Sequence, residues 1–327
     1  MTTAVSAKAK QLKLIKTLWG IDDPISPDLF RSIRQEGYHG VEVIRLAYLF
    51  DKSGLIESLN AANLSLVCQI HTCGGYLDET TKEYIYCGSD SLQDHKRDFQ
   101  RQIEECEGLL EQVSAGGFIN VHAGVDAWNT DETMEFMIFC LDEIEKSAKD
   151  TLITFETHRQ RLFGNPFQTR EILSNLETAG KLDRLKLNAD LSHWYCACER
   201  VFDSNKQPDV KWWPKLLEQV AERCYYIHAR FGWAQGPQMA DPSAKECEVE
   251  RILQLETWKS LINQQLQRES VEDGQLLDIY MSPEYGPSPY LASLPHIQDP
   301  VASLPSAVAY TKSEIEKLFS QVSINKI

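Results

Sequence analysis

The chain has 327 residues, which is enough to bury a full core as one large α/β barrel or as two ordinary domains. No change of composition marks a linker, so we expect one domain over residues 1–327. The formal net charge of -15 argues against non-specific binding to nucleic acid, because an acidic surface repels a polyanion.

The sequence shows no signal for export or for membrane insertion. It has no run of about 18 apolar residues, and the stretch from Met1 to Lys10 lacks an apolar core. The 9 cysteines are an odd number without a Cys-x-x-Cys pair, and Cys68, Cys140 and Cys224 lie inside apolar runs. We therefore expect reduced thiols, a cytoplasmic location and no membrane contact.

Apolar runs and helical patterns alternate along the chain. The expected strands cover residues 13–19, 40–44, 65–71, 118–122, 152–157, 185–190, 224–229 and 275–281. The expected helices cover residues 28–35, 54–62, 92–113, 131–149, 167–178, 211–222, 245–267 and 311–320. Eight such units predict a single closed (β/α)8 TIM barrel of the α/β class rather than an open sheet. No Gly-rich nucleotide motif follows a strand, so a nucleotide cofactor is not expected.

The run from Leu185 to Trp194 predicts a buried strand that leads into a loop with metal-binding groups. Asp190 and His193 stand at its exit, three residues apart. A carboxylate and an imidazole at this spacing can flank one divalent cation. The same pair also fits an Asx turn beside a surface histidine, so further ligands are needed to decide.

Other apolar runs supply such ligands at their carboxyl ends, namely His71, His122, Glu156, His228 and Glu284. In a (β/α)8 barrel these ends share the face where active sites lie. Four consecutive strands therefore carry the expected metal ligands, which are Glu156, Asp190, His228 and Glu284. Three carboxylates and one imidazole suit one divalent cation, with Mn²⁺ favoured, Mg²⁺, Co²⁺ or Fe²⁺ acceptable and Zn²⁺ still open.

Such a site predicts proton-transfer chemistry on a polyol. A cation that holds a carbonyl and a neighbouring hydroxyl acidifies the C–H bond between them, because it stabilises the enediolate that forms. We expect Glu156 and Glu284 to be catalytic, each binding metal with one oxygen and moving a proton with the other. Two bases on two faces give epimerisation, whereas one base with a carbonyl shift gives isomerisation. Either carboxylate could instead be purely structural.

Seven further residues near the strand ends are candidate substrate contacts, namely His71, His122, Arg159, His193, Trp194, Arg230 and Gln238. Arg159 and Arg230 could clamp a phosphate or a carboxylate, although surface salt bridges use the same residue type. Trp194 fits either a pocket wall or the core. His95 and His296 lie away from strand ends, and we expect both to face solvent.

Short segments at the strand ends resemble the xylose isomerase-like TIM barrel superfamily, which includes sugar isomerases, ketose 3-epimerases and zinc apurinic endonucleases. They are Ile70-His-Thr, Val121-His-Ala-Gly, Phe155-Glu-Thr-His, Ala189-Asp-Leu-Ser-His, Ile227-His-Ala-Arg and Pro283-Glu-Tyr-Gly. The resemblance covers strands three to eight and implies the same four metal ligands. It also implies that His193 contacts substrate or a second metal, and that His71 and His122 match endonuclease-type ligands.

The chain departs from individual members of that superfamily. Endonucleases have Asp-x-His after the seventh strand, whereas the segment from Phe231 to Pro242 contains no histidine, and Gln238 is the nearest polar candidate. Ketose 3-epimerases have a second glutamate where Leu162 stands, and xylose isomerase has a lysine at the place of His158.

The sequence therefore predicts a metal-dependent isomerase or epimerase of a sugar, polyol or hydroxy-carbonyl compound. An apurinic endonuclease-like phosphodiesterase and a polyol dehydratase are the alternatives, and a non-catalytic barrel that binds a sugar or a protein is a third. The expected partner is a small sugar-like molecule rather than nucleic acid, and a homo-oligomer is compatible with the sequence.

Overall fold

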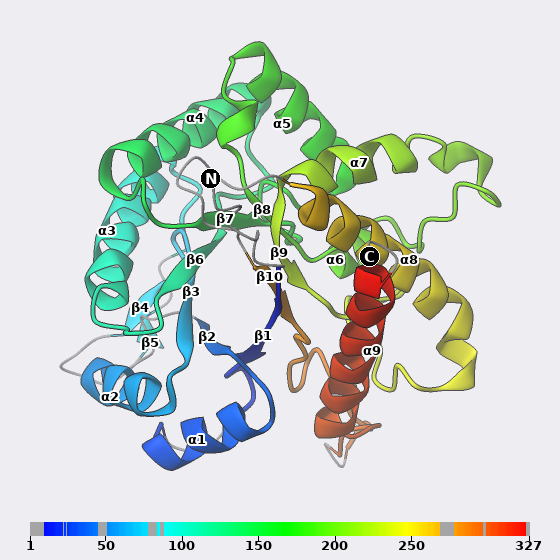
Figure 1. Cartoon of the computed structure of the whole chain (residues 1–327). Coiled ribbons are helices and arrows are strands. Elements are labelled where there is room, and N and C mark those ends of the chain that lie inside the picture. Colours follow the sequence, from blue (N-terminus) through cyan, green and yellow to red (C-terminus); the bar gives the residue numbers. More distant parts are fainter. Residues whose placement is uncertain are drawn as a thin grey trace, which may run out of the picture.

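The computed structural model describes residues 10–21, 23, 25–44, 51–77, 84–85, 88–268, 278–296 and 299–324. Eight parallel strands close into a barrel in the order β1-β10-β9-β8-β7-β6-β3-β2 (Figure 1). They are β1 (Leu12–Thr17), β2 (Gly40–Ile44), β3 (Ser65–His71), β6 (Gly117–His122), β7 (Ile153–Glu156), β8 (Leu187–Ala189), β9 (Cys224–His228) and β10 (Ile279–Ser282). The predicted (β/α)8 fold is thus confirmed.

Helices surround the barrel on its outer face (Figure 1). They are α1 (Pro27–Gln35), α2 (Lys52–Ala62), α3 (Leu92–Leu110), α4 (Thr130–Ser147), α5 (Pro166–Thr178), α7 (Trp213–Arg223), α8 (Glu248–Gln267) and α9 (Leu304–Ile324). Helix α9 begins at Leu304, earlier than the expected residue 311. Pro305 does not prevent this start, because it lies in the first helical turn, where amide groups have no intrahelical acceptor. No helix of the described residues is long and apolar enough to cross a membrane.

Polar side chains mark where several helices begin. Ser26 accepts a hydrogen bond from the amide of Leu29 at the start of α1. Asn129 and Glu132 form a reciprocal capping box at the start of α4, so both amides gain an acceptor. Such caps stabilise the helix starts that follow the loops on the barrel face where the site lies.

Several short elements were not expected. A hairpin of β4 (Tyr76–Leu77) and β5 (Tyr84–Ile85) follows β3, and α6 (Ser192–Ala197) follows β8. The described residues also form three 3-10 turns, η2 (Leu182–Arg184), η3 (Pro208–Val210) and η4 (Lys245–Cys247). Elements of two to six residues are too short to show a periodic pattern. Strand β8 is shorter than expected, because Asp190 leaves the sheet to accept a hydrogen bond from the amide of Ser192.

Alternate residues of each strand point into the barrel and change from apolar to polar along it. Ile15, Val67, Phe118 and Tyr226 pack together as one buried cluster, which we call the barrel floor. The ring of Phe118 lies 5.0 Å from that of Tyr226 and 5.1 Å from that of Tyr280. The polar inward positions follow at the carboxyl ends, so the floor separates the candidate site from the opposite end of the barrel.

The described cysteines are all free thiols, as expected. Cys68, Cys106, Cys140 and Cys224 are buried in or beside the sheet and the helix layer. Residues 275–277 of the last expected strand lie outside the described part of the chain.

Candidate metal centre

Four strand ends bring the expected ligands together in the barrel. Asp190, His228 and Glu284 offer ligand atoms within 4.8 Å of one another, and so do Glu156, Asp190 and His193. All five side chains are buried, with at most 4% of each residue exposed. Charged groups this deep need partners of opposite charge or a metal ion, because burial alone penalises them.

Glu156 is held through one oxygen only. Its Oε2 accepts from Asn120 Nδ2 at 2.7 Å, from His122 Nε2 at 2.8 Å and from Asn188 Nδ2 at 3.1 Å. Burial raises the pKa of Glu156, but His122 and His228 outweigh it and hold that pKa well below its usual value. The carboxylate is therefore anionic, and its other oxygen is free of hydrogen bonds from the described residues.

His228 is fixed from both sides of its ring. Its Nε2 lies 2.8 Å from Glu42 Oε2, and its Nδ1 lies 3.3 Å from an oxygen of Glu156 and 3.3 Å from one of Glu284. Burial lowers the pKa of His228, but Glu42, Glu284 and Glu156 together raise it well above its usual value. Because Glu42 holds Nε2, Nδ1 is the nitrogen that would bind a metal ion. The metal would compete there with a proton for the same lone pair.

Glu42 is a site residue that sequence analysis missed. It is fully buried on β2 and also accepts from the hydroxyl of Tyr226 at 3.0 Å and from Asn120 Nδ2 at 3.3 Å. A carboxylate that fixes the distal nitrogen of a metal-binding imidazole is a common feature of metal sites. The sequence did contain a signal for Glu42, which is a carboxylate between two valines of an expected core strand. An unpaired charge in such a strand is costly, so the residue must have a partner.

The sequence analysis also missed a layer of side-chain amides that lies two residues before the site residues along their strands. Gln69, Asn120 and Asn188 each stand two residues before an expected site residue, so alternation places them on the same inward face. Gln69 Nε2 lies 2.9 Å from His122 Nε2, and Asn188 also accepts the amide of His228 at 3.1 Å. Counting back in steps of two from the strand ends would have found this layer.

Arg230 places a guanidinium group directly among the carboxylates. Its Nη2 contacts Asp190 Oδ2 and lies 2.8 Å from His193 Nε2 and 3.3 Å from Glu284 Oε2. Burial, His158 and Arg230 all lower the pKa of His193, so its imidazole is neutral and accepts from Arg230. His193 is therefore tied to Arg230 and Asp190 rather than exposed to the cavity.

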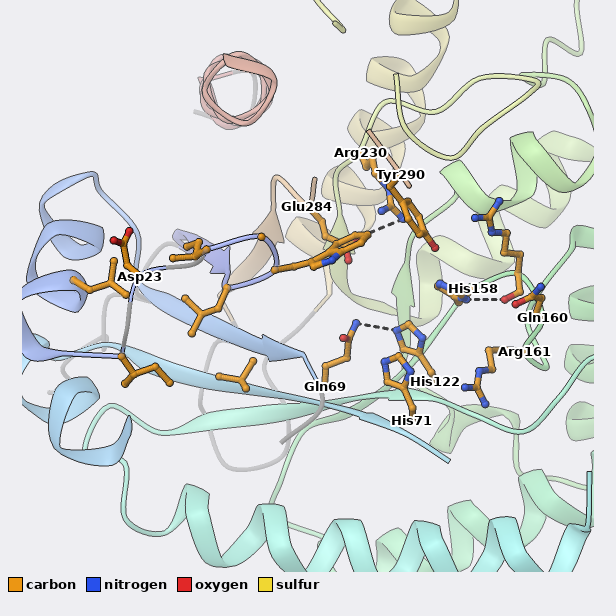
Figure 2. A pocket seen from close by; sticks show the side chains of 18 residues that line it. Asp23, Gln69, His71, His122, His158, Gln160, Arg161, Arg230, Glu284 and Tyr290 are labelled. Atoms are coloured by element: carbon orange, nitrogen blue, oxygen red, sulfur yellow. Dashed lines mark hydrogen bonds and ion pairs between the residues drawn. The ribbon is translucent and has the colours of Figure 1, made fainter. Parts of the chain in front are cut away.

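A cavity of about 740 Å³ opens above these residues (Figure 2). Of the expected substrate contacts, His71, His122, Arg159 and Arg230 line it, together with Glu284. The His71 and His122 rings stack at 4.0 Å between centroids. The cavity therefore brings most of the predicted contacts to one place at the barrel mouth.

Trp194 and Gln238 do not line this cavity, contrary to expectation. Trp194 is fully buried and donates its indole N–H to the carbonyl of Phe163 at 2.8 Å. Successive residues of a helix point about 100° apart, so on α6 His193 faces the site and Trp194 the core. Both ends of the Gln238 amide bind the backbone of Gly286, at 3.0 Å and 2.8 Å, which leaves little for a substrate.

Other cavity residues correct or extend the sequence analysis. Trp19 and Tyr290 lie on loops after β1 and β10 and line the cavity with His158, and no periodic pattern marks such loop positions. His95 is buried rather than solvent-facing, because its ring nitrogens bind Thr72 Oγ1 at 2.7 Å and the carbonyl of Ser89 at 2.8 Å. His296 is exposed, as expected.

The donor atoms fit a divalent cation. Glu156 Oε1, His228 Nδ1 and Glu284 Oε2 are buried and make no hydrogen bond to the described residues. Buried polar atoms left without partners are costly, and a cation bound by Asp190, His228 and Glu284, whose ligand atoms lie within 4.8 Å of one another, would satisfy the last two of these atoms. The chemistry of the donor set, carboxylate oxygen with imidazole nitrogen, is also that of catalytic metal sites.

No protein-family model and no curated protein matches the sequence. Among solved structures, the chain is similar to an IolI protein with a bound zinc atom, at 13% identity and a TM-score of 0.55 over 95% of this chain and 99% of that one. It is also similar to an AP endonuclease of family 2 from Brucella melitensis, at 13% identity and a TM-score of 0.52 over 85% and 94%. A xylose isomerase domain protein from Alicyclobacillus acidocaldarius matches at 12% identity and a TM-score of 0.50 over 95% and 99%. At these identities the likeness shows a shared TIM-barrel fold.

Proposed function

We propose that this chain is a divalent-metal-dependent isomerase or epimerase of a sugar or a related hydroxy-carbonyl compound. The observation that carries the proposal is that buried Asp190 shares one donor group with His228 and Glu284 and a second with Glu156 and His193, at strand ends where Glu284 lines the cavity. Three carboxylates and one imidazole favour Mn²⁺ among the common divalent ions. The similar IolI structure has a bound zinc atom, which supports a metal ion in such a barrel.

Glu284 has the position and charge of a general base. It lines the cavity, and although burial raises its pKa, Arg230 and His228 outweigh that effect and hold the pKa at about 2. The carboxylate is therefore unprotonated at neutral pH and can accept a proton, while the low pKa limits its strength as a base. A divalent cation bound here would polarise a substrate carbonyl and acidify the adjacent C–H bond.

Glu156 is less suited to move a proton. It does not line the cavity, and three N–H donors hold one of its oxygens. We therefore assign Glu156 to metal binding and Glu284 to proton transfer. This replaces the expectation from the sequence that both carboxylates move a proton. One cavity-facing base favours a proton shift between neighbouring carbons, which is isomerisation, over epimerisation by two bases.

Arg230 argues against a phosphodiesterase. Enzymes that cleave phosphodiesters with clustered metals need a second set of donors beside the first. Here the guanidinium group of Arg230 already contacts His193, which the resemblance offers as a ligand for a second metal. A fixed organic cation in this place leaves one metal site, which is what carbonyl polarisation requires.

Deuterium exchange tests the proposal. Aldoses, ketoses, inososes and hydroxy acids are incubated with Mn²⁺-loaded protein in heavy water, and we expect deuterium at one carbon of a product isomeric with its substrate. A Glu284→Gln variant, compared with the parent at a Mn²⁺ concentration that gives both proteins one ion per chain, should lose exchange by at least about a hundredfold, since it removes the general base. Glu256→Gln, on the exposed face of α8, is the matched control.

Three results would contradict this account. Loss of water from the substrate would indicate a dehydratase, and nicking of an abasic-site duplex would indicate the endonuclease-like alternative. Exchange at the parent rate in metal-loaded Glu284→Gln would remove Glu284 from the reaction.

A further inference from the structure

Cations are concentrated in the cavity of a strongly acidic chain. The described walls carry Arg159, Arg161 and Arg230 against the carboxylates of Asp23 and Glu284, whereas the whole chain has a formal net charge of -15. The average surface repels anions, so guanidinium groups gathered in one cavity give it a local preference for negative charge.

The three arginines differ in what they bind. Arg161 donates its Nη1 to the backbone carbonyls of Thr72 at 3.0 Å and Gly124 at 2.9 Å, and so joins two loops. Half-buried Arg159 forms no ion pair with a carboxylate of the described residues; its Nη1 reaches the weak acceptor Cys196 Sγ at 3.6 Å, and its guanidinium group also interacts with the side chain of Tyr290. Among the described residues, Arg159 is thus a cavity cation without a counter-charge.

Arg230 has an unused donor. Its residue is only 2% exposed, and its Nη2 makes the contacts with Asp190, His193 and Glu284. Its Nη1 finds no hydrogen-bond acceptor among the described residues. A buried N–H group without an acceptor is costly, and because Arg230 lines the cavity, a ligand there can supply one.

Tyr290 brings the two arginines to the same place. The Cζ atoms of Arg159 and Arg230 each lie 5.2 Å from the centroid of its ring, and Trp19 packs edge-on against it at 4.7 Å. Figure 2 shows Tyr290 beside Arg230 above the histidines of the opposite wall. Stacking on an aromatic face holds a guanidinium plane in position before any ligand arrives.

From these contacts we infer that the substrate carries an anionic group, a carboxylate or a phosphate, which binds Arg159 and Arg230 beside Tyr290. Guanidinium groups pair with either anion through parallel N–H donors, so the chemistry of the site is the same for both. The inference rests on the proposed function and narrows its substrates to sugar acids or sugar phosphates.

Calorimetric titration of the Mn²⁺-loaded protein and of EDTA-treated protein with D-glucuronate, D-glucose 6-phosphate and D-glucose tests the inference. We expect at least one anion to bind about tenfold more tightly than glucose, and the tighter anion identifies the group. Arg159→Gln should weaken binding of the preferred anion about tenfold and so remove most of this preference, with Arg159→Lys between Arg159→Gln and the parent. Arg97→Gln, which removes an exposed charge from α3, should change nothing.

Equal affinities for glucose and both anions would overturn the inference. So would an anion preference that survives in Arg159→Gln, because the anion would then bind elsewhere, at the metal for example. These titrations need no turnover, so an anion preference without deuterium exchange would refute the proposed reaction alone.

Discussion

At the scale of single residues, the site depends on how each ionisable side chain is held. Glu42 and Glu156 contact His228 from two sides, and Arg230 contacts Asp190 and Glu284. Sequence analysis identified the residues at strand ends, because barrel geometry places those ends on one face. It did not identify Glu42, since a carboxylate within an apolar strand has no partner that is visible in sequence.

Glu42→Gln should weaken metal binding without removing a ligand. The variant keeps the size of the side chain but takes the negative charge from the partner of His228 Nε2. Loss of such an outer partner lowers metal affinity by about 10- to 100-fold. Calorimetric titration with Mn²⁺ measures this, with exposed Glu36→Gln as the control. Equal affinity in parent and Glu42→Gln would show that the contact does not support the metal.

At the scale of elements, the alternation of strands and helices was predictable because each element is long enough to show its period. The short helix α6 was not, and its direction decides that His193 faces the site while Trp194 packs in the core. The loop that carries Tyr290 was likewise beyond prediction, because loop positions follow no periodic rule. The positions of the strands therefore were predictable, while the cavity walls formed by loops were not.

The barrel floor should govern stability and leave the site intact. Phe118→Ala removes a ring that packs on Tyr226 and Tyr280, and we expect a loss of about 3–5 kcal/mol in the free energy of unfolding. Exposed Phe167→Ala should cost far less. Urea unfolding measures both, and metal content measured on the folded Phe118→Ala protein should match the parent. Similar losses in the two variants would contradict a packed floor.

At the scale of the whole molecule, one barrel separates stability from chemistry along its axis. Apolar residues close one end, and the opposite end gathers charged and polar groups from all sides of the sheet. The overall acidity limits binding of polyanions, while arginines make the cavity locally attractive to a small anion. The account as a whole depends on one divalent cation bound where the carboxylates of β7, β8 and β10 meet His228.

Metal content per chain tests this claim most directly. Purified protein is equilibrated with Mn²⁺, dialysed and analysed by inductively coupled plasma mass spectrometry, beside Asp190→Asn and the exposed control Asp209→Asn. We expect about one ion per chain in the parent and the control, and a loss of most of it in Asp190→Asn, because an amide is a weaker ligand than a carboxylate. Equal metal content in parent and Asp190→Asn, or no metal in the parent, would contradict the account.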